Sequence, residues 1–324
     1  MANTLLNAVK DLRNDSLRDL VSVFAFAGEA PVVATSPFQG NNYGYTSGGS
    51  INGLRTNIID KFPFSTDANA TDVGDLTPGR YKSSGQSSAT HGYTSGGNAP
   101  TGLVNVIDKF PFASGGNASD VGDMTSNRER GAGQSSIPNG YGYVSGGSLS
   151  IDKFPFSSDA DATAAGDLTF NRYFVAGQSS QTHGYTSGGH PVLNIIDKFP
   201  FSSDDNATDV GDLTLARGYI AGQSSTTHGY TSGGYTGVTP GVYSNIIEKF
   251  SFTSNGNATD VGDLTLARYS PAGQSSTTHG YNSGGGGVGI GKDIIDRFPF
   301  ATDGNATDVG DLTQYRYYNA GQQY

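Results

Sequence analysis

Four short sequence patterns recur along this 324-residue chain, each in six copies with small exchanges. Gly-Tyr-x-Ser-Gly-Gly begins at Gly44, Ile-Asp-Lys-Phe-Pro-Phe at Ile59, Gly-Asp-Leu-Thr at Gly74 and Gly-Gln-Ser-Ser at Gly85. Successive copies lie roughly 40–50 residues apart, a period typical of β-propeller blades and of paired-helix solenoids. The fold therefore depends on whether the repeated unit is made of strands or of helices.

Short strands fit the repeated unit better than helices. Between residues 37 and 324 no helical period is sustained, and Gly, Asn, Asp and Pro bound short apolar runs. Phe62 and Phe64 share one face of such a run while Ile59 points to the other, as expected for a strand covered on both sides. Pro63 has no N–H to donate, so we expect this strand to lie near a blade edge or to end there.

Four strands are expected in each unit. In the second full unit they are placed at residues 85–88, 92–95, 104–112 and 121–124. Four strands in each of six units predict an all-β, six-bladed propeller. The alternatives are a β-solenoid and a string of small β modules, but a solenoid coil usually has only about 20–30 residues.

The ends of the chain suggest how the ring closes. If Gly-Gln-Ser-Ser is the first strand of a blade, the first blade lacks this strand upstream. The C-terminal residues 318–324 contain the altered sixth copy and can pair beside residues 43–47. We therefore expect the C-terminal strand to close the ring and remove the exposed sheet edge.

The unit resembles a kelch-type repeat at three places. These are the glycine pair 48–49, the aromatic residues Phe62 and Phe64, and Arg80, which returns in every unit. The Trp common in kelch units is missing. The resemblance implies a kelch-like propeller over residues 40–324, in which the loops after Gly-Gly and after the Arg share one partner-binding face. The near-identical units also resemble repeat proteins of marine tailed phages.

The N-terminal segment differs from the repeats. Over residues 1–26, apolar residues recur at three- and four-residue steps, which predicts a short amphipathic helix. We expect it to anchor or oligomerise the chain, and the alternative is that it packs on its own propeller. Residues 27–42 read as a linker and residues 43–324 as the propeller.

Composition excludes several classes of protein. Without Cys there is no disulfide, thiolate nucleophile or Cys-based zinc site, and a net charge of −10 disfavours nucleic-acid binding. No apolar run reaches the roughly 18 residues of a membrane span, and no signal peptide is apparent. We expect no membrane insertion.

Repeated polar residues have simpler explanations than catalysis, which needs one asymmetric set of groups. Asp60 and its counterparts are expected to pair with the repeated Arg from blade to blade.

Histidines stand at the same place in four units, at His91, His183, His228 and His279. We expect each to hydrogen-bond within its own blade, and the alternative is a metal-binding ring.

One repeated loop has the spacing of a calcium site. Asp67, Asn69, Thr71 and Asp75 supply side-chain oxygens at alternating positions, and Ca²⁺ takes six to eight oxygen ligands. These residues are weak calcium candidates, because Asn, Asp and Thr also form self-satisfied turns without metal. No other cofactor is expected.

The units differ mainly in the loops after Gly-Gly and after the repeated Arg, which are rich in Tyr. Tyr offers a large contact area with few rotors and a polar tip, which suits glycan or protein recognition; the alternative is neutral drift in exposed loops. The candidate binding residues are Tyr81, Arg130, Tyr173, Phe174, Tyr219, Tyr235, Tyr243, Tyr269 and Tyr317.

These features together predict a non-enzymatic structural or adhesin-type protein of a virion: a fibre, tail or capsid-decorating component. We expect it to form a homo-oligomer, to join other virion proteins through the N-terminal helix, and to bind a host-surface glycan or protein. The alternatives are a free lectin-like propeller that binds glycans and an enzyme with its site in the central channel.

Overall fold

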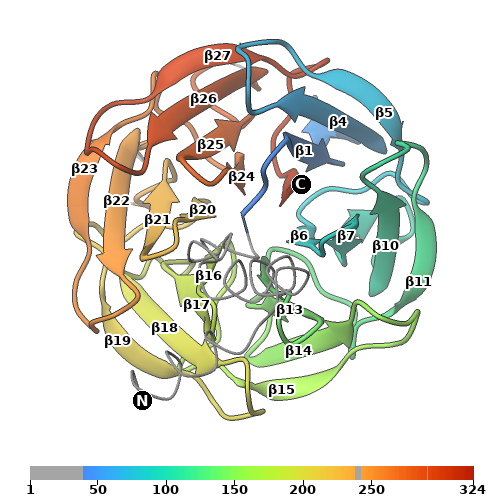
Figure 1. Cartoon of the computed structure of the whole chain (residues 1–324), viewed down its shortest axis with the longest axis horizontal. Helices are drawn as coiled ribbons and strands as arrows, with labels where there is room; N and C mark the ends of the chain where they lie inside the picture. Colours follow the sequence, from blue (N-terminus) through green and yellow to red (C-terminus); the bar gives the residue numbers. More distant parts are fainter. Residues whose placement is uncertain (1–38, 238–241, 290) are drawn as a thin grey trace, which may run out of the picture. The chain divides into compact units, whose positions relative to one another are not determined.

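The computed structural model describes residues 39–237, 242–289 and 291–324. Over these residues it shows six four-stranded antiparallel sheets arranged radially around an axis (Figure 1). The prediction of an all-β, six-bladed propeller with four strands per blade is therefore confirmed. The predicted helix at residues 1–26 lies outside the described residues, as does most of the predicted linker at 27–42. No helix in the described part is long and apolar enough to cross a membrane.

Each blade is a meander whose first strand lies at the axis and whose fourth lies at the rim (Figure 1). From the axis outward, the first blade consists of β28 (Ala320–Gln323), β1 (Tyr43–Ser47), β4 (Ile58–Pro63) and β5 (Thr71–Asp75), and the second of β6 (Ser84–Ser87), β7 (His91–Ser95), β10 (Val106–Pro111) and β11 (Ser119–Asp123). The third blade consists of β12 (Ala132–Ser136), β13 (Tyr141–Ser145), β14 (Ser150–Pro155) and β15 (Thr163–Asp167), and the fourth of β16 (Ala176–Ser179), β17 (His183–Ser187), β18 (Ile195–Pro200) and β19 (Thr208–Asp212). The fifth blade consists of β20 (Ala221–Ser224), β21 (His228–Ser232), β22 (Ile246–Ser251) and β23 (Thr259–Asp263), and the sixth of β24 (Ala272–Ser275), β25 (His279–Ser283), β26 (Ile294–Pro299) and β27 (Thr307–Asp311). Two small hairpins, β2 (Ser50–Ile51) with β3 (Leu54–Arg55) and β8 (Asn98–Ala99) with β9 (Gly102–Leu103), extend two of the loops.

The strands of the second blade lie within two residues of their predicted positions. β4 ends at Pro63, as its missing N–H predicts. Pro63 lies opposite Tyr43 of β1, whereas the pairing of β4 with β5 stops at Lys61 and Thr71. The proline therefore removes no hydrogen bond from the outer ladder.

The C-terminal strand closes the ring. β28 pairs with β1 in antiparallel register, from Gly44 opposite Gln323 to Ser47 opposite Ala320. The first blade is thus built from both ends of the propeller sequence, as predicted. Every inner strand is paired along its outer side, so the ring has no open blade.

Aromatic residues hold neighbouring blades together. On one face of the first blade, Tyr45 and Ile59 pack against Phe110 and Phe112 of the second blade. On the other face, Phe62 packs against the sixth blade. The rings of Tyr45 and Phe112 lie 4.7 Å apart, a geometry that contributes about 0.5–1.5 kcal/mol beyond area burial. Both faces of the third strand are therefore buried, as its sequence predicts.

Six glycines let the inner strands meet at the axis. A Cβ at any of them would lie within 3.0 Å of the backbone oxygen of the preceding glycine in the ring, so any other residue would push two blades apart. The axial glycines are Gly85, Gly133, Gly177, Gly222, Gly273 and Gly321.

Six buried ion pairs join each blade to the next. In every pair the repeated Arg reaches the repeated acid of the following blade, and both side chains are at most 3% exposed. Asp108, for example, lies 3.0 Å from Arg80 and also accepts from the backbone N–H of Thr77. The predicted blade-to-blade network is confirmed. The pairs are Arg80–Asp108, Arg128–Asp152, Arg172–Asp197, Arg217–Glu248, Arg268–Asp296 and Arg316–Asp60.

Candidate functional site

The two variable loop sets lie on one face of the ring, as predicted. Each is joined to the other by isolated backbone bridges, such as Tyr173 with His190 and Tyr269 with Gly286. Because these bridges hold the loops against each other, the side chains from both sets form a single surface. We call this surface the tyrosine face.

A ring of backbone hydrogen bonds surrounds the mouth of the channel on the tyrosine face. Six residues, one at each blade junction, have φ between 51° and 69°, and each N–H donates to the carbonyl oxygen of the preceding one over 2.7–3.0 Å. The circle closes between the last and the first. We call these residues the mouth ring: Lys82, Arg130, Phe174, Tyr219, Ser270 and Tyr318. Positive φ is uncommon outside glycine, so the closed circle holds these side chains in a fixed arrangement.

One half of the mouth is charged. Glu129 lies 2.6 Å from the guanidinium of Arg130 and 3.6 Å from Lys82. Arg130 also lies 4.8 Å from the centre of the Phe174 ring, a cation–π distance. Burial lowers the pKa of Lys82, and Glu129 opposes this shift.

The other half of the mouth is aromatic and surrounds an open cavity of about 210 Å³. The described residues that line it are all tyrosines: Tyr219, Tyr235, Tyr243, Tyr269 and Tyr318. The rings of Tyr243 and Tyr269 stack at 5.0 Å, while Tyr219 stands at 87° to Tyr235 and to Tyr269. Burial raises the pKa of Tyr219, Tyr269 and Tyr318, so these three phenols are neutral at physiological pH.

The other predicted binding residues surround this cavity. Tyr317 lies 5.9 Å from Tyr269, Tyr81 lies 5.9 Å from Tyr318, and Tyr173 lies 5.7 Å from Phe174, measured between ring centres. All nine predicted residues therefore lie on the tyrosine face. Whether they bind a ligand stays a prediction.

Tyr318 and Lys82 are central to the mouth but are not among the predicted binding residues. Tyr318 contacts both the aromatic and the charged half, lying 5.2 Å from Lys82. Both residues stand two positions after a repeated Arg, as do Arg130, Phe174 and Tyr219. Aligning the six units on that Arg gives the signal that identifies them.

The tyrosine face also carries exposed apolar side chains. Each belongs either to a loop after Gly-Gly or to a connection with the repeated Arg, and each is 39–85% exposed. They are Leu54, Leu103, Leu149, Phe170, Leu215, Val242, Leu266 and Val288. A one-sided concentration of apolar groups is typical of an interaction surface.

The predicted calcium residues have protein partners in the structure. Asp67 lies 2.6 Å from Arg297, and the Asn69 side chain accepts from the backbone N–H of Asp311. Thr71 and Asp75 begin and end β5. Among the described residues, no three His, Asp or Glu side chains are grouped as metal ligands. Calcium binding stays a prediction.

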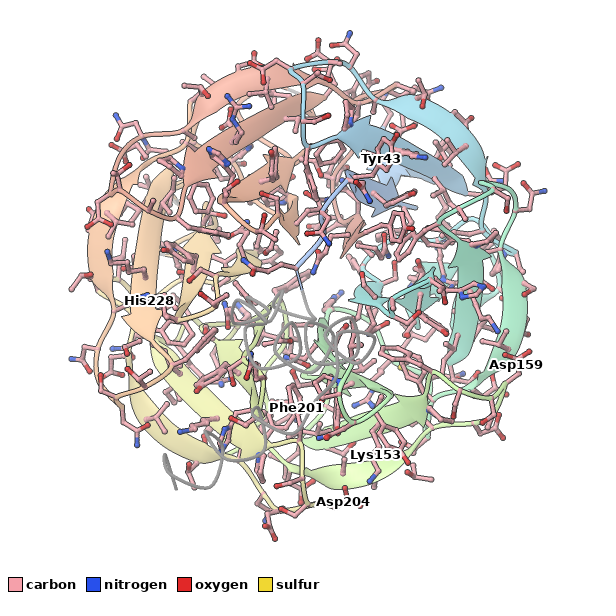
Figure 2. All side chains as sticks on the ribbon, in the orientation of Figure 1. Tyr43, Lys153, Asp159, Phe201, Asp204 and His228 are labelled. Carbon is pink, nitrogen blue, oxygen red and sulfur yellow. The ribbon has the colours of Figure 1, made fainter. Side chains whose placement is uncertain are left out.

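The same rim position forms ion pairs in other blades. Lys153 lies 2.6 Å from Asp204, and Lys109 lies 2.7 Å from Asp159 of the next blade; Lys153, Asp204 and Asp159 stand at the rim in Figure 2. Asp67 thus belongs to a repeated set of exposed pairs, each typically worth about 0–1 kcal/mol.

The repeated histidines bond locally, as predicted. The Nδ1 atom of His91 lies 2.8 Å from the hydroxyl of Thr90, and its backbone N–H donates to Ser88. The same pair of contacts recurs at His183, His228 and His279. Burial lowers the pKa of these four imidazoles.

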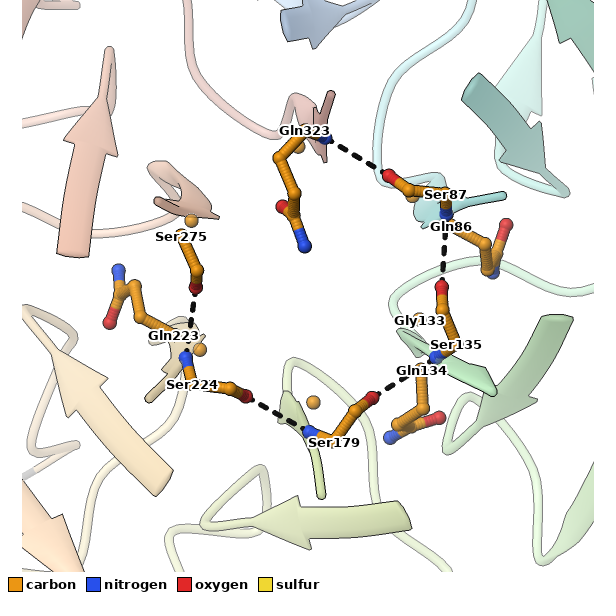
Figure 3. Close-up of a pocket in the computed structure, with 15 residues that line it drawn as sticks. Gln86, Ser87, Gly133, Gln134, Ser135, Ser179, Gln223, Ser224, Ser275 and Gln323 are labelled. Carbon is orange, nitrogen blue, oxygen red and sulfur yellow. Dashed lines mark hydrogen bonds between the residues drawn. The ribbon is translucent and has the colours of Figure 1, made fainter. Parts of the chain in front are cut away.

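The channel is lined by Gly, Ser and Gln (Figure 3). Serine hydroxyls accept hydrogen bonds from backbone N–H groups of the neighbouring blade. The Ser135 hydroxyl accepts from the N–H of Ser87, and the Ser87 hydroxyl accepts from the N–H of Gln323 (Figure 3). Six buried glutamines donate hydrogen bonds to the next blade. Gln134, for example, donates to the carbonyl oxygen of Tyr185. These side chains serve the contacts between blades.

No protein-family model matches the chain, and no curated protein matches it significantly. The six-bladed propeller is shown by the structure. The resemblances to kelch repeats and to phage repeat proteins stay predictions.

Proposed function

We propose that the protein is a non-enzymatic recognition module of the adhesin type, which binds a surface glycan or protein through the tyrosine face. One observation carries this proposal: the variable loops of all six units converge on one face and place a tyrosine-lined cavity at its centre. Loops held by a rigid scaffold are where recognition residues usually lie.

The rigidity of the face supports binding. The mouth ring is held by a closed circle of backbone hydrogen bonds, and Arg–carboxylate pairs buried beneath it join the blades. Tyrosines fixed in this way lose little conformational entropy when a ligand arrives, which reduces the cost of association.

The setting we propose is a virion, as a fibre, tail or capsid-decorating component that contacts the host surface. The amphipathic pattern of residues 1–26 supports an anchor to other virion proteins and a homo-oligomer. Gln39 donates to the carbonyl oxygens of Ser224 and Ser276, at the end of the inner strands away from the mouth ring.

A free lectin-like propeller is the second candidate function. The tyrosine cavity favours it, because glycan binding needs no particle. Detection of the protein by mass spectrometry in purified virions supports the virion setting, and glycan binding without virion association supports the lectin. Turnover of an oligosaccharide contradicts both and indicates an enzyme.

The proposal is tested with the full chain on glycan arrays and on host cells. A variant with Tyr173, Tyr243 and Tyr317 changed to Ser removes three aromatic rings spread over the tyrosine face. Tyr141→Ala is the matched control, since Tyr141 begins β13 at the other end of its blade. We expect binding by wild type and by the control, and at least a tenfold loss in the triple variant. Equal binding by all three proteins, or none by the wild type, overturns the proposal.

A further inference from the structure

We propose that the tyrosine cavity binds one uncharged pyranose unit of a glycan. This inference rests on the proposed function and makes it specific. The site consists of Tyr219, Tyr235, Tyr243, Tyr269 and Tyr318.

The mouth ring departs from the repeat in the fifth unit, next to the cavity. Five mouth-ring positions carry large side chains, but Ser270 is small and stands between Tyr219 and Tyr318 in the circle. Where the position is large, the gap is filled: Phe174 stacks on Tyr219 with ring centres 3.7 Å apart. Ser270 puts no ring beside its two neighbours in the circle, Tyr219 and Tyr318, and both of these line the cavity.

A long loop supplies the remaining walls. The loop after Gly233-Gly234 contributes Tyr235 and Tyr243, whose backbones form a bridge and whose rings lie 6.0 Å apart. Tyr243 then stacks on Tyr269, and the Tyr269 ring in turn contacts Tyr219 and Tyr318 of the mouth ring. The site is thus one asymmetric feature in a molecule of near-identical units, as selective binding requires.

The chemistry of the lining matches a neutral sugar. Aromatic faces at right angles offer apolar surface to the C–H groups of a pyranose ring. The five tyrosines are only partly buried, and none of their hydroxyls hydrogen-bonds another described side chain. These hydroxyls are available as donors and acceptors to sugar hydroxyls.

The size of the cavity also fits one sugar ring. Its volume of about 210 Å³ lies below the roughly 300–1,000 Å³ of pockets for drug-sized ligands. A single pyranose enters while the rest of the glycan continues across the tyrosine face.

The charged half of the mouth provides the competing prediction. Lys82 and Arg130 favour an acidic sugar, but both face Glu129, which offsets their charge. Neither of them lines the tyrosine cavity. The geometry therefore favours a neutral ligand in the cavity.

The test uses saturation-transfer NMR on the full chain. The probes are methyl α-D-galactopyranoside, methyl α-D-mannopyranoside and methyl α-D-glucopyranoside as neutral sugars, and N-acetylneuraminic acid as the acidic one. Ser270→Phe places an aromatic ring between Tyr219 and Tyr318, beside the cavity, with a residue that the mouth ring accepts at Phe174, also at positive φ. Tyr243→Ala removes one wall, and Tyr141→Ala, at the other end of its blade, is the control away from the tyrosine face.

We expect at least one neutral glycoside to bind wild type and Tyr141→Ala, with at least a tenfold weaker affinity in Ser270→Phe and Tyr243→Ala. Binding that both cavity variants retain, or binding of N-acetylneuraminic acid alone, overturns the inference. Absence of sugar binding by a chain that still binds host cells through its tyrosine face also overturns it, while leaving the proposed function intact.

Discussion

Arg316, near the C-terminus, pairs with Asp60 of the first blade over 3.1 Å, and both side chains are fully buried. Asp60 also accepts from the backbone N–H and the hydroxyl of Thr313. The contact joins residues more than 250 positions apart in sequence. It is one of six equivalent pairs, but it is the one that links the last blade to the first.

Removing one partner of this pair is expected to be costly. Asp60→Ala leaves the Arg316 guanidinium buried without its carboxylate, and such a loss typically costs about 3–5 kcal/mol. The free energy of unfolding, from denaturant titration, measures it. Asp204→Ala is the control, because the ion pair of Asp204 with Lys153 is exposed. We expect this pair to contribute at most about 1 kcal/mol to the free energy of unfolding. Equal losses in the two variants would contradict the importance of burial.

The axial glycines predict a second large effect. Gly133→Ala places a methyl group against the backbone oxygen of Gly85, and overpacking of this kind typically costs about 1–3 kcal/mol. Gly304→Ala is the matched control, since no atom lies within 4 Å of a Cβ built there. Thermal unfolding should show a lower melting temperature for the first variant and little change for the second. A larger fall in melting temperature for Gly304→Ala than for Gly133→Ala would contradict the close contact between inner strands at the axis.

Buried tyrosines predict a loss of stability at alkaline pH. Burial raises the pKa of Tyr93, Tyr185 and Tyr230 from 10.0 to about 12. The folded state thus favours the neutral phenols, so their contribution is complete below pH 10 and is lost as the pH rises toward 12. Tyr185→Phe should make the fall of the melting temperature over this range less steep. A variant that falls as steeply as wild type would refute the assignment.

The rim contacts predict the outcome of a calcium titration. Since Asp67 is paired with Arg297, we expect neither added Ca²⁺ nor a chelator to move the melting temperature. Differential scanning calorimetry of the full chain measures this. A calcium-dependent rise that Asp67→Ala removes would instead establish the calcium site.

Sequence predicts the blades well because their determinants are local. Turn residues bound each strand, Pro63 ends one of them, and alternating apolar groups identify two buried faces. The repeat also predicts that Asp60 pairs with a repeated Arg, because a feature present in every unit has a structural role.

The mouth ring and the true partners of the rim loops could not be predicted. Positive φ at bulky residues such as Phe174 and Tyr219 has no local signal, because the hydrogen bonds that stabilise it come from other blades. The loop of Asp67 considered alone has the spacing of a calcium site and gives no sign of Arg297, which lies 230 positions away in sequence. Contacts of this kind exist only once the ring has closed.

Ring closure by β28 is the claim on which the tyrosine face depends, and truncation tests it most directly. A chain that lacks residues 320–324 should lose β28, and its melting temperature should fall sharply because the edge of β1 is exposed and the buried contacts of Gln322 are lost. A synthetic peptide of residues 318–324, added in trans, should restore much of the loss. An unchanged melting curve after truncation would contradict closure of the ring by the C-terminal strand.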